Sequence, residues 1–170
     1  MKVSEAIKYK RAVRNFRDEP LSADVINTIL NAGRRSQSSK NSQPWDFIVI
    51  THKDRLEKLS KLGTYAGHLA GAALAVVIIT PDPGLKTSIM FDAGQAAAYM
   101  QLAAWELGVG SCLATIYKTN EARLLLDLPD DRYVNLALSF GYPADRSVLT
   151  STPEKGGRKQ LADFVHWESW

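Results

Sequence analysis

The chain has 170 residues, which suits one domain because soluble domains typically span about 100–200 residues. Hydrophobic residues make up 45% and charged residues 23%, a balance that excludes a disordered tail protein, a collagen and a coiled coil. The formal net charge of +3 is too small to argue for a nucleic-acid partner, but it leaves room for a local basic pocket. A single cysteine, Cys112, excludes an intrachain disulfide and a cysteine zinc site.

Membrane and metal signals are both absent from the sequence. Met1 leads into no apolar signal segment, and the longest apolar run, residues 74–79, is far shorter than a membrane span. The three histidines have no metal-ligand spacing to one another or to cysteine. We therefore expect a soluble, cytoplasmic protein without a metal site.

Apolar periodicity and turn residues divide the chain into helices and strands. The residues after Ser22, a plausible N-cap, follow helical spacing, and the wholly apolar residues 74–80 predict a strand buried on both faces. The Ala-rich residues 91–107 predict a central buried helix, and Asn120 is expected to cap a helix. In chain order we expect a short helix at 3–7, a helix from 22 to about 33, a loop at 34–43, a strand at 47–50, a helix at 56–62, a strand at 74–80, a helix at 91–107, a strand at 111–116, a helix from 120 to about 127, a strand at 134–140 and a tail at 150–170.

Few strands separated mainly by helices fit an α/β or α+β sandwich flanked by helices. No Gly-x-Gly-x-x-Gly follows any strand, so a Rossmann dinucleotide site has no support, and there is no Walker A lysine loop. Asp92, at the start of the Ala-rich helix, is most simply a partner of the helix dipole. Cys112 is expected to be a small buried hydrophobic residue, and no carboxylate pair stands out for acid–base catalysis.

Two basic clusters lie far apart in the sequence. Lys10 and Arg14 are four residues apart, so on a helical turn they share one face. The simpler interpretation is that these cations interact favourably with the C-terminal end of the helix dipole. A phosphate needs two or three converging donors, and the sequence leaves open whether the clusters meet around one. The first cluster comprises Lys10, Arg11 and Arg14, and the second comprises Lys155, Arg158 and Lys159.

A polar loop at residues 38–45, SSKNSQPW, precedes the first strand. Its hydroxyl and carboxamide groups suit the edge of a flat heterocycle, because an amide donates and accepts side by side. The simpler interpretation is a solvated loop that turns at Pro44. Trp45 could brace this loop against the core.

Taken in order, these segments resemble the FMN-dependent nitroreductase family, in a short-chain type, over essentially the whole chain. Residues 10–16, KRAVRNF, are similar to the family's Arg-Arg-Ser-x-Arg-x-Phe, with Ala12 in place of the usual Ser. The loop at 38–45 matches Ser-x-x-Asn-x-Gln-Pro-Trp, which is the most specific element. Residues 108–111, 141–143 and 157–159 resemble further family segments.

The resemblance implies an α+β fold: a three-layer sandwich with a mostly antiparallel central sheet flanked by helices. It implies a single FMN-binding domain over residues 1–170 and an intertwined homodimer with two FMN at its interface. The tail at 150–170 would pack on the partner subunit, since its aromatic residues would otherwise form a costly exposed patch. Folding of the tail back onto its own subunit is the alternative.

The resemblance also implies an oxidoreductase in which NAD(P)H reduces FMN at N5 and a nitroaromatic, quinone or similar small-molecule acceptor then takes the electrons, in ping-pong order. No side chain is expected to be catalytic, because the cofactor supplies the chemistry. The alternatives are a flavin-storage protein without NAD(P)H turnover and an ordinary anion-binding module. The implied contacts are Lys10, Arg11, Ala12, Arg14, Arg158 and Lys159 at the phosphate, Ser38, Ser39 and Asn41 from the other subunit, backbone groups of Leu113, Ala114 and Thr115 along the N5 and O4 side of the flavin, and Tyr65 and His68 in a substrate pocket.

Overall fold

Four strands form one antiparallel sheet in the order β1-β2-β4-β3. The computed structural model describes residues 2–151 and 157–170, apart from the side chain of Asn135. The two outer strands of the sheet are β1 and β3, and the two inner strands are β2 and β4. The strands are β1 (Asp46–Ile50), β2 (Leu74–Thr80), β3 (Gly110–Thr115) and β4 (Tyr133–Gly141).

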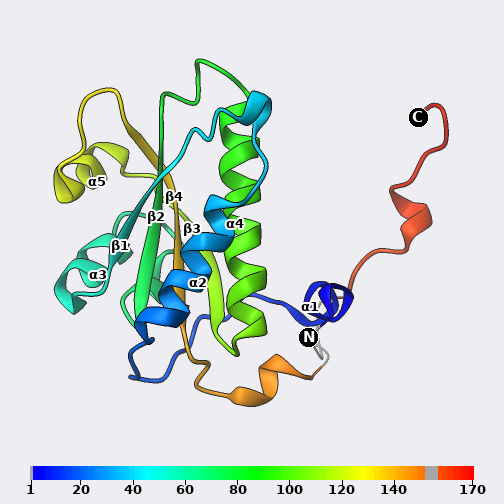
Figure 1. Ribbon diagram of the computed structural model, residues 1–170, viewed down its shortest axis with the longest axis horizontal. Helices are drawn as coiled ribbons and strands as arrows, with labels where there is room; N and C mark the ends of the chain where they lie inside the picture. Colours follow the sequence, from blue (N-terminus) through cyan, green and yellow to red (C-terminus); the bar gives the residue numbers. More distant parts are fainter. Residues whose placement is uncertain (1, 152–156) are drawn as a thin grey trace.

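Strand β2 is buried at all seven residues, as the sequence predicts. Alternate side chains of a strand point to opposite faces, so β2 contributes to two cores. Val76 packs with α2 (Ala23–Arg34) and α4 (Ser88–Glu106) on one face. Val77 packs with α3 (Lys53–Ser60) and α5 (Thr119–Leu126) on the other. Figure 1 shows the resulting three layers, which confirm the predicted sandwich with an antiparallel sheet.

Local sequence explains most helix boundaries. Ser22 caps α2, because its Oγ accepts a hydrogen bond of 3.3 Å from the N–H of Val25. Asn120 is not the cap of α5, which begins at Thr119 after Lys118 and places Asn120 inside its first turn. The remaining helical elements are α1 (Val3–Tyr9) and the short 3-10 turns η1 (Ser39–Asn41), η2 (Gly67–Leu69), η3 (Arg146–Leu149) and η4 (Leu161–Asp163).

Helix α4 is only partly the buried helix that the sequence predicts. It begins at Ser88, three residues earlier than expected, since nothing after Gly84 interrupts a helix. Its inner face carries small residues such as Ala93 and Ala97, which allow close packing on the sheet. Its outer face remains exposed, with Phe91 69% exposed.

The segment between α1 and α2 extends the sheet beyond its edge strand β3. Ala12 forms a parallel bridge with Ser111, and the N–H of Val13 donates to the Ser111 carbonyl at 2.9 Å. This approach requires glycine at position 110, because a Cβ there would lie 2.7 Å from Cβ of Val13. The basic residues around Ala12 are thereby fixed beside β3.

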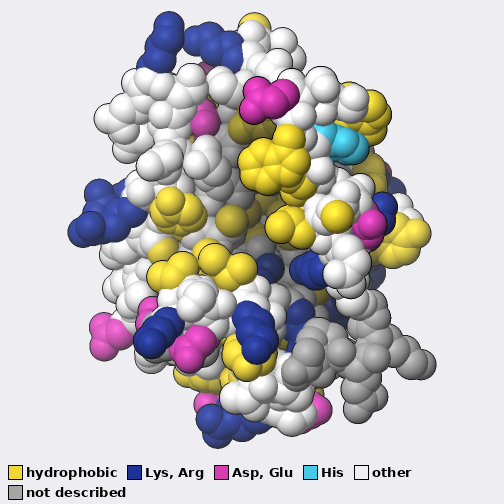
Figure 2. Space-filling view, turned by 90° about the vertical axis from the view of Figure 1, so that its right-hand side faces the viewer, with side chains coloured by type: hydrophobic (Ala, Val, Ile, Leu, Met, Phe, Trp, Pro, Cys, Tyr) yellow, Lys and Arg dark blue, Asp and Glu magenta, His cyan; other side chains and the backbone are white. Residues whose placement is uncertain are grey.

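The tail and the outer side of α4 expose many apolar side chains. In Figure 1 the tail after residue 157 extends away from the body, beyond α1. Figure 2 shows that hydrophobic side chains gather across the middle of this side of the molecule, with Lys and Arg side chains beside them. In the described residues, no helix is long and apolar enough to cross a membrane. The exposed large apolar residues of α1, α4 and the tail include Val3, Ile7, Phe91, Leu161, Phe164, Trp167 and Trp170.

Candidate functional site

A basic cluster lies where α1 meets α4. Lys10 follows the last residue of α1, and its Nζ donates a hydrogen bond of 2.9 Å to Oε1 of Gln101. Gln101 is buried in α4, so the Lys10 side chain is anchored to a rigid helix. Burial lowers the pKa of Lys10, Cys112 opposes this shift, and the positive charge of Arg158 adds to it. Of the second basic cluster, Arg158 therefore lies close enough to Lys10 to affect its charge.

The members of the two clusters are not equally free to bind an anion. Arg11 is engaged within its own chain, donating to the carbonyl oxygens of Val148 at 2.5 Å and Ser151 at 2.7 Å. Lys159 is exposed and joins the cluster by no hydrogen bond or ion pair among the described residues, whereas Lys155 lies outside those residues. The structure therefore brings together Lys10, Arg14 and Arg158, with Arg11 at their side.

Arg14 lines an open pocket of about 590 Å³ together with Tyr65 and His68. Tyr65 is 83% exposed, whereas His68 is 8% exposed and lies in η2. Burial lowers the pKa of His68, the positive charge of Arg14 lowers it further, and the Leu113 backbone opposes both. Nδ1 of His68 lies 2.8 Å from Oγ of Ser139, so this ring is fixed at the floor of the pocket.

The edge of β3 that faces away from β4 is covered by other segments at its two ends, and between them the described residues form no backbone pairing with it. At one end Ser111 pairs with the Ala12 segment. At the other end the Thr115 carbonyl oxygen is covered by Gly63, where a Cβ would lie only 2.2 Å from that oxygen. Since the Ser111 carbonyl points to this edge and strand residues alternate, the peptide groups of Leu113 face the edge between the two ends.

The three predicted β3 residues differ in exposure. Leu113 is 44% exposed, Thr115 is exposed and Ala114 is buried at 3%. Ala114 faces the core beside Ala137, its partner on β4. Since the peptide groups of Leu113 face the free edge, those of Ala114 face β4, and the structure turns neither its side chain nor its backbone toward the open edge.

The loop with Ser38, Ser39 and Asn41 is held by a buried carboxylate of α4. Both carboxylate oxygens of Asp92 lie 3.1 Å from the backbone nitrogen of Ser39, which donates to them. The Ser38 hydroxyl accepts from the N–H of Gln43 at 2.9 Å. Lys40, Asn41 and Gln43 have φ angles of 54°, 54° and 47°, a region that is costly for residues other than glycine.

This loop and the basic cluster lie at opposite ends of α4 within one chain. Asp92 and Gln101 are nine residues apart, which corresponds to about 14 Å along a helix axis. In Figure 1 η1 lies beside the upper end of α4, and α1 lies beside its lower end. One chain therefore does not gather all the predicted ligand groups at one place.

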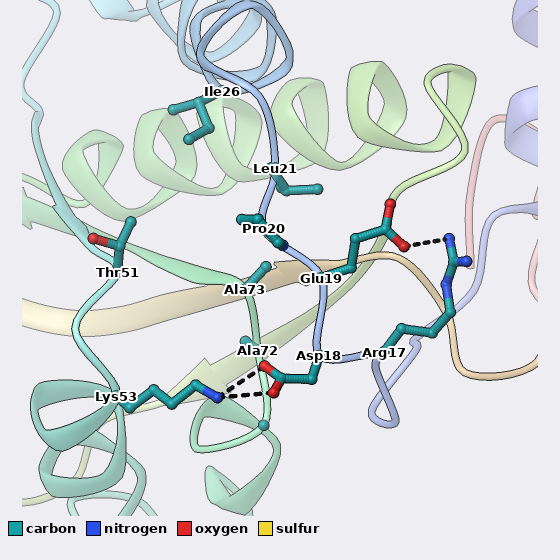
Figure 3. A pocket seen from close by; sticks show the side chains of 11 residues that line it. Arg17, Asp18, Glu19, Pro20, Leu21, Ile26, Thr51, Lys53, Ala72 and Ala73 are labelled. Atoms are coloured by element: carbon teal, nitrogen blue, oxygen red, sulfur yellow. Dashed lines mark hydrogen bonds and ion pairs between the residues drawn. The ribbon is translucent and has the colours of Figure 1, made fainter.

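A separate pocket of about 270 Å³ lies beside the segment that leads into α2. Its rim carries two exposed ion pairs, Arg17 with Glu19 at 3.1 Å and Lys53 with Asp18 at 2.8 Å. Figure 3 shows that both pairs are made around the pocket by its own residues. Its charges thus partner one another, in contrast to Arg14 in the neighbouring pocket.

Cys112 is buried as predicted, at 3% exposure. Burial raises the pKa of its thiol, while Arg14 and Lys10 lower it. Within residues 2–151 and 157–170, no three His, Cys, Asp or Glu side chains are grouped to hold a metal ion.

Three polar residues of this region were not singled out as site residues by sequence reasoning. Asp92 was interpreted only as a dipole partner, although it bonds the backbone of Ser39. Gln101 and Ser139 received no role. The available signal is the same for all three, because each is a polar residue in a mostly apolar helix or strand.

Comparison with known proteins extends over most of the chain. A sequence profile of the nitroreductase family matches residues 7–63 and 61–142. The nitrobenzene nitroreductase of Ectopseudomonas oleovorans is 40% identical over 96% of this chain and 97% of its own length. The FMN reductase [NAD(P)H] of Bacillus subtilis is 26% identical over 86% of this chain and 68% of its own. The structure of an FMN-dependent nitroreductase from Clostridium difficile superimposes with a TM-score of 0.84, at 29% identity, over 98% of this chain and 99% of that one.

Proposed function

The chain belongs to the nitroreductase family, and from this premise we propose that it is an FMN-dependent NAD(P)H oxidoreductase that reduces nitroaromatic, quinone or similar acceptors. When bound, FMN supplies the redox chemistry, taking a hydride from NAD(P)H at N5 and passing electrons to the acceptor in ping-pong order. The chain's own residues bind this cofactor, orient it and shape the space above it.

The donor set of the basic cluster fits the phosphate of FMN. A phosphate carries close to two negative charges and three acceptor oxygens, and two or three converging cations satisfy it. Lys10 and Arg14 both lower the pKa of Cys112, and Arg158 lowers that of Lys10. We assign Lys10, Arg14 and Arg158 to the phosphate. Arg11 takes part only if it releases its bonds to Val148 and Ser151.

The open edge of β3 fits the polar edge of the flavin ring. Backbone groups at Leu113 and Thr115 are held in the fixed geometry of β3, whose Ser111 pairs with the segment that carries Arg14, and N–H donors held in this way stabilise negative charge on a reduced ring. Gly63 and Ala12 limit the edge to the length of a few peptide groups. This arrangement supports the roles proposed for Leu113 and Thr115, whereas the N–H and C=O groups of Ala114 point toward β4.

The separation of the two ligand segments supports a site shared between two copies of the chain. His68 of η2 lies on the α3 and α5 side of the sheet, where its neighbour Leu69 belongs to that core, whereas η1 is attached to α4 on the other face. A flavin that runs from Lys10 along the β3 edge therefore leads away from Ser39 of the same chain. We assign Ser38, Ser39 and Asn41 to the flavin of the partner subunit.

The exposed apolar residues support the same homodimer. Large contiguous apolar patches are rare on monomeric proteins and mark contact surfaces. Phe91 on α4 and Ile7 on α1 are 69% and 65% exposed on one side of the molecule, and Trp167 in the tail is 84% exposed. We propose that a second copy covers these side chains and that residues 150–170 pack on it.

The pocket above Arg14 is the proposed place for the acceptor. Tyr65 presents an exposed aromatic ring there, which suits a flat aromatic molecule, and His68 is held at the floor.

The observation that carries the proposal is that Lys10 and Arg14 both lie close enough to Cys112 of β3 to lower its pKa, on the segment that pairs with the free edge of this strand at Ser111. The test is a titration of the apoprotein with FMN in which the quenching of flavin fluorescence measures binding. We expect yellow protein with one FMN per chain. A colourless protein that binds no FMN would contradict the proposal, and bound FMN that NAD(P)H never reduces would indicate flavin storage instead.

A further inference from the structure

Two polar side chains, one carboxylate and one carboxamide, are buried on the mostly apolar inner face of α4. Asp92 is 3% exposed and Gln101 is 8% exposed. Burial of such groups is costly unless hydrogen bonds replace water. Each of them is paired with a segment that we assign to the cofactor, so their position along α4 fixes where those segments lie.

Asp92 restrains a loop that would not hold its shape alone. Three of its residues have positive φ, and such strained conformations persist only where surrounding structure determines them. The Asp92 carboxylate accepts from the Ser39 N–H through both oxygens at 3.1 Å. This hydrogen bond connects the backbone of η1 to the buried side of α4.

Gln101 has the matching role at the other end. Its Oε1 accepts the hydrogen bond of Lys10 Nζ at 2.9 Å, which fixes a flexible side chain in one direction. Lys10 is half-buried, and the positive charge of Arg158 lowers its pKa. Without Gln101, the lysine would lose the contact that aims it toward the cluster.

We propose that Asp92 and Gln101 are positioning residues for different active sites of the dimer: Gln101 for the FMN of its own chain, and Asp92 for the FMN of the partner subunit. The proposal rests on the shared site described under the proposed function. It follows from the geometry, because Gln101 holds a phosphate ligand of its own chain while Asp92 holds the loop about 14 Å away that faces outward.

Mixed dimers test this assignment. Two differently tagged chains are co-expressed, and the dimer carrying both tags is isolated and titrated with FMN. One chain carries Arg14→Ala, and the other carries either Asp92→Ala or Gln101→Ala. Each variant alone, as a homodimer, is expected to bind FMN about tenfold more weakly than the wild type or worse.

The two pairings have opposite expected results. In the Arg14→Ala and Asp92→Ala pair, both defects fall on one site, so the other site binds one FMN per dimer with wild-type affinity. In the Arg14→Ala and Gln101→Ala pair, each site has one defect, so no FMN binds with wild-type affinity. A merely structural role of Asp92 would not restore a whole site, because its damage would fall on the chain that carries it.

The alternative outcomes are separable. If the Asp92→Ala pair has no wild-type site while wild-type dimers bind FMN, the positioning proposal is wrong and the proposed function stands. If the wild-type chain binds no FMN, both are wrong. If it binds FMN as a monomer, the shared site and the positioning proposal are wrong, whereas the proposed FMN-dependent activity stands. Should Asp92→Ala not fold, Asp92→Asn is used in the same pairing, since Asn keeps the size and one acceptor oxygen, and the same stoichiometry decides.

Discussion

The guanidinium of Arg11 donates to the carbonyl oxygen of Ser151 at 2.7 Å and to its hydroxyl at 2.8 Å. A third bond, at 2.5 Å, reaches the Val148 carbonyl oxygen. These contacts join the segment after α1 to the segment after η3, across 140 residues of sequence. Arg11 thus ties these two segments together. Arg14, three residues later in the sequence, lines an open pocket instead.

Arg11→Ala and Arg14→Ala are therefore expected to have different effects. Loss of the Arg11 bonds should lower the free energy of unfolding by about 1–3 kcal/mol, because hydrogen bonds to charged groups are involved. Arg14→Ala should weaken FMN binding at least tenfold and change stability little. Chemical denaturation and FMN titration of both variants measure this. A larger loss of FMN affinity in Arg11→Ala than in Arg14→Ala would reverse the assignment.

Ala12→Ser should strengthen FMN binding. Ala12 is exposed next to the basic cluster, and the resembling family motif has a serine hydroxyl at this position. One hydrogen bond to a charged group is worth about 1.5 kcal/mol, or roughly tenfold in affinity. Ala12→Val is the control, since it adds volume without a donor. Equal FMN affinities of the Ser and Val variants would show that no phosphate oxygen lies there.

Gly63→Ala should destabilise the fold and disturb the β3 edge. The new Cβ would lie 2.2 Å from the Thr115 carbonyl oxygen, a backbone atom that cannot move freely. We expect a loss of about 1–3 kcal/mol in the free energy of unfolding, as for other overpacked sites. Gly67→Ala is the matched control, because its Cβ meets nothing within 4 Å. Similar stabilities of the two variants in thermal unfolding would refute this close contact.

The stability of the protein should depend on pH through His68. Burial first, and then Arg14, lowers the pKa of His68 below its ordinary value of 6.5. Above that pH the imidazole is neutral in both states and the stability is fully present. As the pH falls below about 6.5 the unfolded chain takes up the proton first, so stability is lost until the folded pKa is passed.

Denaturation of the wild type and His68→Asn across this pH range checks the effect. The variant should lose the part of the slope that lies below pH 6.5. Arg14→Ala should raise the pKa of His68, which NMR titration measures directly. An unchanged slope in His68→Asn would mean that other groups cause it.

Truncation of residues 161–170 should weaken dimerisation more than it affects the fold of each chain. Trp167 and Trp170 are 84% and 100% exposed within a single chain, so they contribute little to its core. Sedimentation velocity of the truncated protein should show monomers at concentrations where the full chain is dimeric. A large drop in the stability of the monomer body would instead indicate that the tail folds on its own subunit.

Sequence reasoning located the elements well where one local pattern dominated. The apolar run of β2 predicted a strand buried on both faces, and Ser22 predicted the start of α2. It failed at Asn120, because N-cap propensity is weak beside the packing of Ala122 and Leu126, which sets where α5 begins. Tertiary packing thus decided the boundary against a local preference.

The candidate site was less accessible to the sequence, because its geometry depends on long-range pairs. Motif spacing indicated Lys10 and Arg14, but no pattern reveals that Lys10 meets Gln101, 91 residues away. Nor could composition tell that Arg11 would be bound by Ser151. Residue types predicted the ligand class, whereas the fold determines which cation is free to bind it.

The central claim is that this chain uses FMN to oxidise NAD(P)H. The most direct measurement is the visible absorption of FMN-reconstituted protein during anaerobic addition of NADH or NADPH. We expect the flavin absorption to bleach with at least one of the two donors and to return when a quinone or nitroaromatic acceptor is added. Flavin that stays oxidised with both donors would contradict the claim.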